Sequence, residues 1–235
     1  MGVFRFKRFS VANEASAQKV GTDAVLLGAA APLPDGSPSV LDVGTGTGVV
    51  ALMLAQRLSD AGKEFRIIGI DSDAPSAAEA SSNFAASEWA ERMEARHMSF
   101  SQCGDAGTWD LIVSNPPYYD MSLEAPDPRR SAARHTDTLS FRELCAYAYD
   151  HLSADGFLSM ILPSDQEKAL MRYAASFSLY PFSILRVRTT ERKPPSRIVV
   201  SFSRHSSPVE ESSLVLMEKG KRTAEYTSLA SGFYM

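Results

Sequence analysis

The sequence predicts an α/β protein whose core is a doubly wound, mostly parallel sheet. Strand and helix patterns alternate from residue 39 onward, which is typical of parallel strands joined by crossover helices. A glycine-rich turn follows the first of these strands, and two late strands are joined by a segment too short to hold a helix. Because such a short connection forms a hairpin, we expect one strand of the sheet to run antiparallel to the others.

The predicted elements follow one another in a regular order. Short apolar runs that predict strands cover residues 39–43, 65–70, 94–98, 109–114, 156–162, 184–188 and 197–203. Segments with the length and apolar spacing of helices cover residues 22–30, 49–58, 74–87, 140–151 and 164–177. Two of these helices carry a start signal, because Pro75 lies in a first turn and Ser140 forms a capping box with Glu143.

The composition is that of one globular domain, residues 1–235. The chain has 235 residues, 44% of them hydrophobic and 22% charged, which suits a single α/β unit. A proline-rich linker at residues 31–38 sets residues 1–38 apart as an N-terminal extension. The longest apolar run, residues 49–55, is far shorter than the roughly 20 residues of a membrane span. The N-terminus lacks the apolar core of a signal peptide, so we expect a cytoplasmic protein.

The glycine turn after the first strand contains Asp42, Gly44, Gly46 and Gly48. No Gly-Lys-Ser/Thr follows, which excludes a P-loop, and the third glycine of a dinucleotide-binding GxGxxG turn is replaced by Val49. An acid two residues before the first glycine repels a pyrophosphate but attracts the ammonium and sulfonium of S-adenosylmethionine. The turn therefore predicts an S-adenosylmethionine site.

Two carboxylates follow the second strand of the sheet. A carboxylate at this position accepts the two hydroxyls of an adenosine ribose, whereas an aspartate before a helix is also a common N-cap. With the glycine turn some residues earlier, we assign the ribose to Asp71 and the cap of the following helix to Asp73.

The fourth strand ends in Asn115, Pro116, Pro117 and Tyr118. The two prolines fix the backbone and remove two amide donors, so carbonyls and the Asn115 side chain are left to face a ligand. A rigid exposed turn is the alternative for an arbitrary Asn-Pro-Pro. At the end of a strand beside a methyl-donor site, the catalytic interpretation is favoured.

The glycine turn, Asp71 and the Asn-Pro-Pro-Tyr sequence, in this order, resemble class I methyltransferases, which have a Rossmann-like sheet and act on planar nitrogen. The resemblance is closer to the bacterial tRNA1(Val) (adenine(37)-N6)-methyltransferase family. The segments that carry this likeness are residues 9–11, 19–29, 110–119, 133–135, 197–202 and 225–234.

The resemblance implies methyl transfer from S-adenosylmethionine to the exocyclic N6 of an adenine. Independently, the Asn115 side-chain oxygen and the Pro116 carbonyl are suited to accept the two amine hydrogens, and Tyr118 is suited to stack on the base. Among class I enzymes an acid after the third strand often binds the donor adenine, but Ser99 and Phe100 stand here instead. Thr22 either reaches the methionine carboxylate or caps its helix, and residues 1–38 are expected to pack over the cofactor cleft.

The tRNA is expected to contact basic residues in the loop of the late hairpin and one that follows the Asn-Pro-Pro-Tyr sequence. These substrate-binding candidates are Arg134, Arg192, Lys193 and Arg197. They belong to a chain with net charge −4, so a local basic cluster would have to attract the phosphates. Solvated or ion-paired side chains are the alternative for each of them.

Other acceptors and other functions stay open at this point. The same Asn-Pro-Pro-Tyr sequence serves enzymes that methylate a protein glutamine amide or a guanine N2 of ribosomal RNA, and a non-catalytic RNA-binding protein is a further alternative. The four histidines share no metal-binding spacing, so we expect no metal site. We expect a monomer that contacts no membrane.

Overall fold

The computed structural model describes residues 2–16, 18–104, 107–116 and 140–234. Its strands are β1 (Val3–Arg5), β2 (Ser10–Ala12), β3 (Ser39–Val43), β4 (Arg66–Asp71), β5 (Met93–His97), β6 (Trp109–Ser114), β7 (Leu152–Pro163), β8 (Tyr180–Arg188), β9 (Arg197–Ser203), β10 (Glu210–Val215), β11 (Met217–Glu218) and β12 (Lys221–Arg222). Its helices are α1 (Thr22–Ala30), α2 (Val49–Asp60), α3 (Ala74–Ala85), α5 (Phe141–His151), α6 (Glu167–Ser176) and α7 (Ala224–Leu229).

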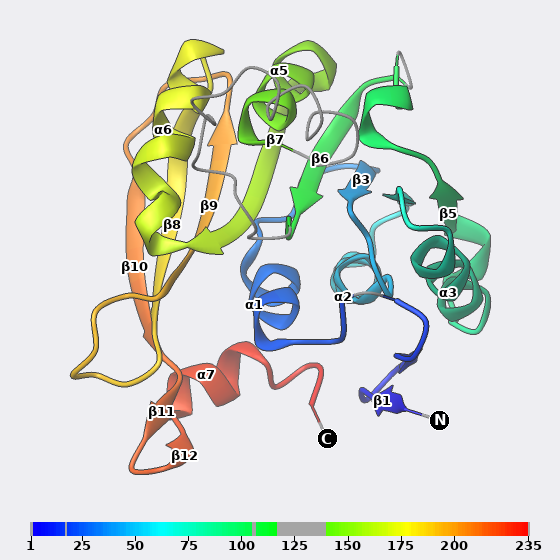
Figure 1. Ribbon diagram of the computed structural model, residues 1–235, viewed down its shortest axis with the longest axis horizontal. Helices are drawn as coiled ribbons and strands as arrows, with labels where there is room; N and C mark the ends of the chain where they lie inside the picture. Colours follow the sequence, from blue (N-terminus) through cyan, green and yellow to red (C-terminus); the bar gives the residue numbers. More distant parts are fainter. Residues whose placement is uncertain (1, 17, 105–106, 117–139, 235) are drawn as a thin grey trace, which may run out of the picture.

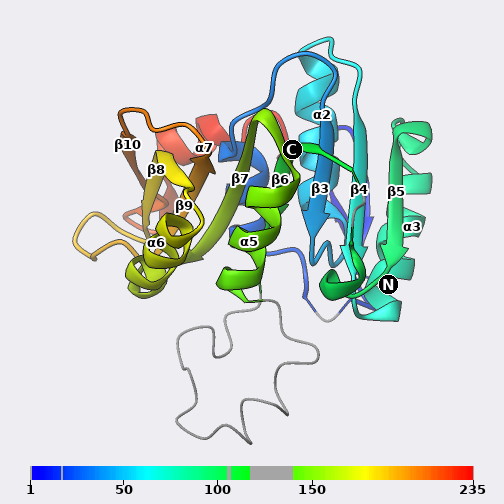
Figure 2. The same cartoon turned by 90° about the horizontal axis from the view of Figure 1, so that it is seen from above.

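Eight strands form one sheet in the order β10-β8-β9-β7-β6-β3-β4-β5, which Figure 2 shows from end to end. Neighbouring strands are parallel except at β9, which runs antiparallel to both β7 and β8. The predicted doubly wound, mostly parallel sheet with one antiparallel strand from a late hairpin is therefore confirmed. Strand order reverses at β3, whose neighbours are β4 and β6.

The sheet has a layer of helices on each face (Figure 1). Residues of α1 and α2 belong to one hydrophobic cluster, which also contains Ala80 and Phe84 of α3. Residues of α5 and α6 belong to a second cluster on the opposite face, with Phe141 and Leu170 fully covered. The alternation of β3 explains the division, because Val40 lies in the first cluster and Leu41 in the second.

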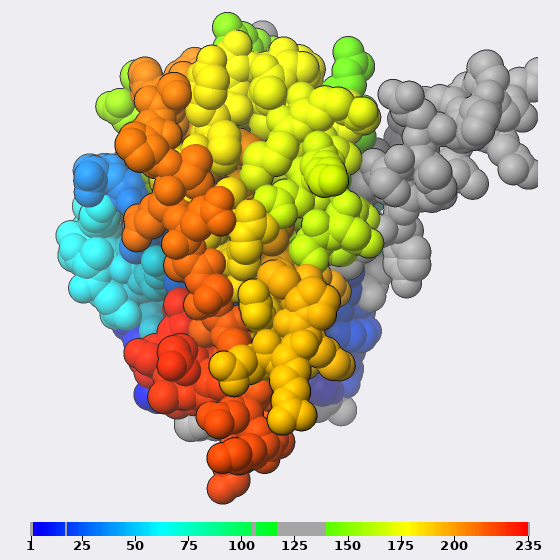
Figure 3. All heavy atoms as spheres, turned by 90° about the vertical axis from the view of Figure 1, so that its left-hand side faces the viewer, coloured from blue at the N-terminus to red at the C-terminus, as the bar shows by residue number. Residues whose placement is uncertain are grey.

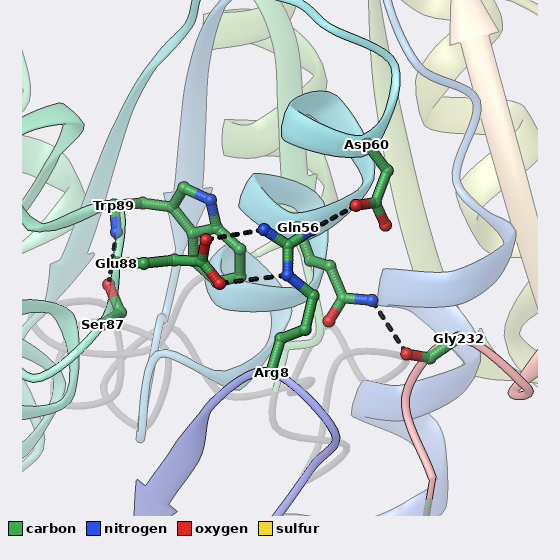
Figure 4. Close-up of polar contacts among 7 residues, drawn as sticks. All are labelled: Arg8, Gln56, Asp60, Ser87, Glu88, Trp89 and Gly232. Atoms are coloured by element: carbon green, nitrogen blue, oxygen red, sulfur yellow. Dashed lines mark hydrogen bonds and ion pairs between the residues drawn. The ribbon is translucent and has the colours of Figure 1, made fainter.

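The N-terminal hairpin β1–β2 and the C-terminal residues pack together beside α2. Phe6 lies against Phe9 and Tyr234, and the Lys7 N–H donates to the Phe233 carbonyl at 2.8 Å. Arg8 binds both Glu88 and Asp60, and Gln56 of α2 donates to the Gly232 carbonyl at 2.8 Å (Figure 4). Side chains from both ends of the chain thus cover one end of the first hydrophobic cluster.

Most predicted boundaries differ from the structure by a few residues, and the differences have local causes. β8 begins at Tyr180 rather than at residue 184, because its pairing with β9 extends to Ser203. The helix expected over 164–177 is divided into a short 3-10 turn, Ser164–Gln166, and α6. The capping box of Ser140 and Glu143 is present, with both reciprocal bonds.

Candidate active site at the carboxyl edge of the sheet

The predicted site residues follow adjacent strands at the point where strand order reverses. Val43, the last residue of β3, pairs with Ile70 on one side and with Ser114 on the other. The Ser114 hydroxyl also donates to the Val43 carbonyl at 2.9 Å, so the ends of β3 and β6 are joined directly. The carboxyl ends of parallel strands at such a switch point are where ligands bind in open α/β sheets.

The glycine turn has a backbone that only glycine adopts easily. Gly44, Gly46 and Gly48 have φ values of 72°, 56° and 79°, all in the left-handed region. A Cβ on Gly48 would lie 2.5 Å from the ring of Phe84, whereas the described residues leave the space beside Gly44 open. Gly48 is thus required by packing, and Gly44 presents bare backbone at the carboxyl edge.

Asp42 lies beneath the glycine turn and is only 1% exposed. Its Oδ2 accepts a hydrogen bond from the Thr45 hydroxyl at 2.8 Å. Burial raises the pKa of this carboxyl to about 7, and the nearby charge of Asp71 adds to the rise, while the Thr45 hydrogen bond opposes it. A cation close to this buried carboxyl would stabilise its ionised form. The contact of Asp42 with the donor's ammonium stays a prediction.

Asp71, the last residue of β4, links the end of this strand to the glycine turn through hydrogen bonds. Its Oδ2 accepts the Gly46 N–H at 2.8 Å and its Oδ1 accepts the Asp73 N–H at 2.9 Å. Two carboxylate oxygens offer about four acceptor positions, so capacity for hydroxyl donors remains. Asp73 is the N-cap of α3 and accepts from the Ser76 N–H at 3.0 Å, which confirms the predicted cap.

The residues proposed to meet the donor adenine follow β5. The Ser99 hydroxyl and the Gln102 side chain form a capping box for the 3-10 turn Phe100–Gln102. The Phe100 ring packs edge-on against Tyr147 of α5, with ring centroids 5.1 Å apart. The half-buried positions of Ser99 and Phe100 suit them to line a ligand site, but their role toward the adenine stays a prediction.

Thr22 is the first residue of α1. The N-cap of this helix is Gly21, so the alternative in which Thr22 caps the helix is wrong. The next residue, Asp23, accepts from Arg197 Nε at 2.9 Å, and Arg197 is paired with Pro163 at the carboxyl end of β7. The start of α1 is thereby held at the same edge of the sheet as the glycine turn.

Asn115 and Pro116 come directly after β6, with Asn115 partly exposed and Pro116 buried. They follow the strand that is bonded to the glycine-turn strand through Ser114. The remaining predicted residues of this region, Pro117, Tyr118 and Arg134, lie outside the described residues.

The basic residues of the late hairpin divide into two groups. Arg186 is bound to Glu167 of α6 at 2.7 and 2.9 Å, Arg197 to Asp23, and Arg204 to the backbone carbonyls of residues 152 and 153. Arg192 and Lys193 instead are exposed in the loop between β8 and β9. This loop projects at the left of Figure 1, and it faces the viewer in Figure 3.

Two buried polar residues of α3 were missed by the sequence analysis. Glu79 and Asn83 are 8% and 4% exposed, and both contact the N-terminal segment. Their signal was present, because an acid and an amide four residues apart lie on the same face of a helix. Nothing in the sequence identifies the backbone N–H and carbonyl groups that they bind, so only the structure shows their partners.

Known proteins similar to this chain indicate its class and family. Residues 16–174 match the family model of the methyltransferase small domain. The chain is 39% identical over 236 residues to a tRNA1(Val) (adenine(37)-N6)-methyltransferase of Bacteroides fragilis, covering 99% of this chain and 97% of that relative. It is 38% identical over 236 residues to the Flavobacterium psychrophilum protein of the same name, with 99% of each chain covered.

Solved structures share the fold at low sequence identity. A predicted O-methyltransferase of Agrobacterium tumefaciens superposes with a TM-score of 0.68 at 17% identity, over 90% of this chain and 96% of that one. A putative class I S-adenosylmethionine-dependent methyltransferase of Listeria monocytogenes reaches 0.55 at 15% identity, over 81% and 62%.

The sheet order, the glycine turn and the two carboxylates around it, with these comparisons, define an S-adenosylmethionine-dependent class I methyltransferase. The open backbone at Gly44 and the carboxylates of Asp42 and Asp71 fit a cationic donor that carries a ribose. Within this class, the chain belongs to the tRNA1(Val) (adenine(37)-N6)-methyltransferase family.

Two further features are absent from the part of the chain that the structure describes. Within that part, no helix is long and apolar enough to cross a membrane. Over the same ranges, no group of three or more histidine, cysteine, aspartate or glutamate side chains is placed to hold a metal ion.

Proposed function

We propose that this chain transfers a methyl group to the exocyclic N6 of adenine 37 in tRNA1(Val). The observation that carries the proposal is the placement of Asn115 and Pro116 after β6, bonded through Ser114 to the end of the glycine-turn strand. The relatives that share nearly the whole chain bear the name of this activity. The chain acts as a single domain and as a monomer in the cytoplasm.

The donor side of the site consists of the glycine turn and the ends of β4 and β5. Bound S-adenosylmethionine would supply an electrophilic methyl group and leave as S-adenosylhomocysteine, while the methylated nitrogen would lose one proton to the solvent. Asp71 accepts the ribose hydroxyls, Asp42 favours the positive charge of the donor, and Thr22 contacts its carboxylate. Ser99 and Phe100 contact its adenine. The bare backbone of Gly44, Gly46 and Gly48 allows the close approach that these contacts require.

The acceptor side consists of the residues that follow β6. The lone pair of an aryl amine is delocalised into the ring, so the nitrogen is a weak nucleophile in a planar form. The Asn115 oxygen and the Pro116 carbonyl accept its two hydrogens and favour a pyramidal nitrogen. We assign Pro117 and Tyr118, which complete the sequence motif, to the same acceptor site, with Tyr118 stacking on the base. Positioning and hydrogen bonding of this kind require neither a covalent nucleophile nor a metal.

The tRNA partner is held by phosphate contacts away from the reacting base. Arg192 and Lys193 are exposed in the β8–β9 loop, and we assign them to the phosphates together with Arg134 and with Arg197, which Asp23 holds at the same edge. An anticodon-loop base is already single-stranded, so placing it in the site costs less than extruding a paired base.

The direct test is methyl transfer from labelled S-adenosylmethionine to total tRNA that lacks the modification, followed by nucleoside analysis. We expect label in N6-methyladenosine. Label in 2-methylguanosine would keep an RNA enzyme but change the base. Label absent from tRNA but present in ribosomal RNA or in protein glutamine would assign the acceptor to one of those alternatives.

A further inference from the structure

One face of α3 binds the N-terminal segment, residues 12–16, through backbone groups. Three successive N–H groups, those of Glu14, Ala15 and Ser16, donate to the carboxylate of Glu79 at 2.7, 2.9 and 2.8 Å. Glu79 is 8% exposed, so these bonds form away from bulk water, where an unpaired carboxylate is costly. Burial raises the pKa of Glu79, but the three bonds outweigh it and the pKa is lowered.

A second residue of the same face connects this segment to the glycine turn. Asn83 accepts the Ala12 N–H at 2.8 Å and donates to the Ala12 carbonyl at 3.1 Å and to the Thr47 carbonyl at 2.8 Å. Asn83 therefore fixes the distance between the segment and the turn. Phe84, the next residue, fills the space against Gly48.

The segment lies directly beside the turn and leads into α1. Ser16 is 2% exposed, and its hydroxyl is 3.4 Å from the position that a Cβ on Gly46 would take. Asn13 Oδ1 then accepts the Val20 N–H at 3.0 Å, which closes the loop two residues before Thr22. Displacement of this segment therefore moves both the neighbour of Gly46 and the start of α1.

From these contacts we propose that Glu79 and Asn83 are positioning residues for the methyl donor. They hold residues 12–16 against the glycine turn, so that the turn and the start of α1 are preorganised when S-adenosylmethionine binds. This inference rests on the proposed function only in taking S-adenosylmethionine as the donor. It does not depend on which acceptor is methylated. Loss of the contacts of Glu79 and Asn83 with residues 12–16 raises the dissociation constant and the KM of the donor. It leaves kcat nearly unchanged, because neither residue contacts the reacting groups.

The first test is Glu79→Gln, which keeps the shape of the side chain and removes its charge. The matched control is Glu88→Gln, whose carboxylate binds Arg8, between β1 and β2 and outside residues 12–16 (Figure 4). Calorimetric binding of S-adenosylmethionine, without tRNA, should weaken at least about tenfold in Glu79→Gln, as expected for charged hydrogen bonds. It should stay within about twofold in Glu88→Gln. Hydrogen exchange at residues 14–16 should accelerate only in Glu79→Gln.

A second variant keeps the proposal testable if Glu79→Gln does not fold. Asn13→Ala removes the bond that closes the loop but leaves α3 intact, and it should weaken donor binding in the same direction by a smaller factor. The proposal is overturned if residues 14–16 exchange faster while donor affinity is unchanged, or if kcat falls and KM does not rise. Failure of the proposed function is a separate result, because the wild-type protein would then bind donor and methylate no tRNA.

Discussion

The two halves of the sheet use polar side chains in opposite ways. In the donor half, from β3 to β5, carboxylates bind backbone N–H groups: Asp71 holds Gly46 and Asp73, and Glu79 holds residues 14–16. In the C-terminal half, from β7 to β10, arginines bind carboxylates and carbonyls that come from elsewhere in the chain, as in the pair of Arg186 with Glu167.

The difference shows which charges are available to a ligand. Around the glycine turn, Asp71 and Glu79 fix the backbone through N–H groups, so we expect a donor to meet a backbone that is already shaped. In the C-terminal half, Arg186, Arg197 and Arg204 join elements of the fold. Arg192 and Lys193 are instead exposed in the β8–β9 loop, where we propose that they meet a phosphate. On the proposals made above, the first region holds the donor against a fixed turn, and the second attracts the phosphates of the tRNA.

The largest predicted effect falls on β6, where the two halves meet. Asn115→Ala removes the oxygen that accepts an amine hydrogen, so methyl transfer should fall by at least about 10³-fold, as for other lost transition-state contacts. Donor affinity measured by calorimetry should change by less than about threefold, because the donor half is untouched. Comparable activity in this variant would remove Asn115 from the mechanism.

The buried acid of the donor half should make stability depend on pH. The pKa of Asp42 is raised to about 7 by burial, so the folded state favours the protonated form and ionisation destabilises it. The cost is absent below pH 4, grows between pH 4 and 7 and is constant above, reaching up to about 4 kcal/mol. Relative to Asp42→Asn, the wild-type free energy of unfolding should fall across this window. An equal difference at pH 4 and pH 8 would contradict the raised pKa.

Two glycines of the turn should separate folding from binding. Gly48→Ala combines a φ of 79° with a 2.5 Å approach to the buried Phe84 ring, and it should lower the free energy of unfolding by about 3 kcal/mol. Gly44→Ala has the same type of φ but open space, and should cost about 1 kcal/mol. Chemical denaturation measures both. Donor affinity should fall in Gly44→Ala despite its milder effect, and equal stability of the two variants would contradict the packing argument.

The smallest effect is predicted in the β8–β9 loop. Arg192→Ala with Lys193→Ala should weaken tRNA binding by about tenfold. The fall of log K with log salt should become less steep, by about 1.5 to 2 in the slope. The control, Arg66→Ala with Arg92→Ala, removes the same charge at the amino ends of β4 and β5, where both form surface ion pairs. Its slope should match the wild type. An unchanged slope in the first variant would move the RNA contacts elsewhere.

The parts of the molecule that were predictable have local physical causes. The glycine turn, the Asp73 cap and the Ser140 capping box each depend on residues within a few positions of one another, and all three are present. Strand β10 was missed because its Glu-Glu-Ser-Ser start lacks an apolar alternation, as an edge strand with one neighbour permits.

The parts that were not predictable depend on distant partners. The basic cluster of the late hairpin looked uniform in sequence, yet Arg186 and Arg197 are bound to Glu167 and Asp23, 19 and 174 residues away. The same holds for Glu79, whose backbone partners lie 63 to 65 residues earlier. Local patterns therefore predicted the donor turn, whereas the assignment of individual charges needed the three-dimensional structure.

The most direct test of the account is methyl transfer to two tRNA1(Val) transcripts that differ only at position 37. We expect one methyl group per molecule, recovered as N6-methyladenosine, in the transcript with adenine 37 and none in the transcript with guanine 37. Methylation of both transcripts, or of neither while the protein binds S-adenosylmethionine, would contradict the proposed acceptor.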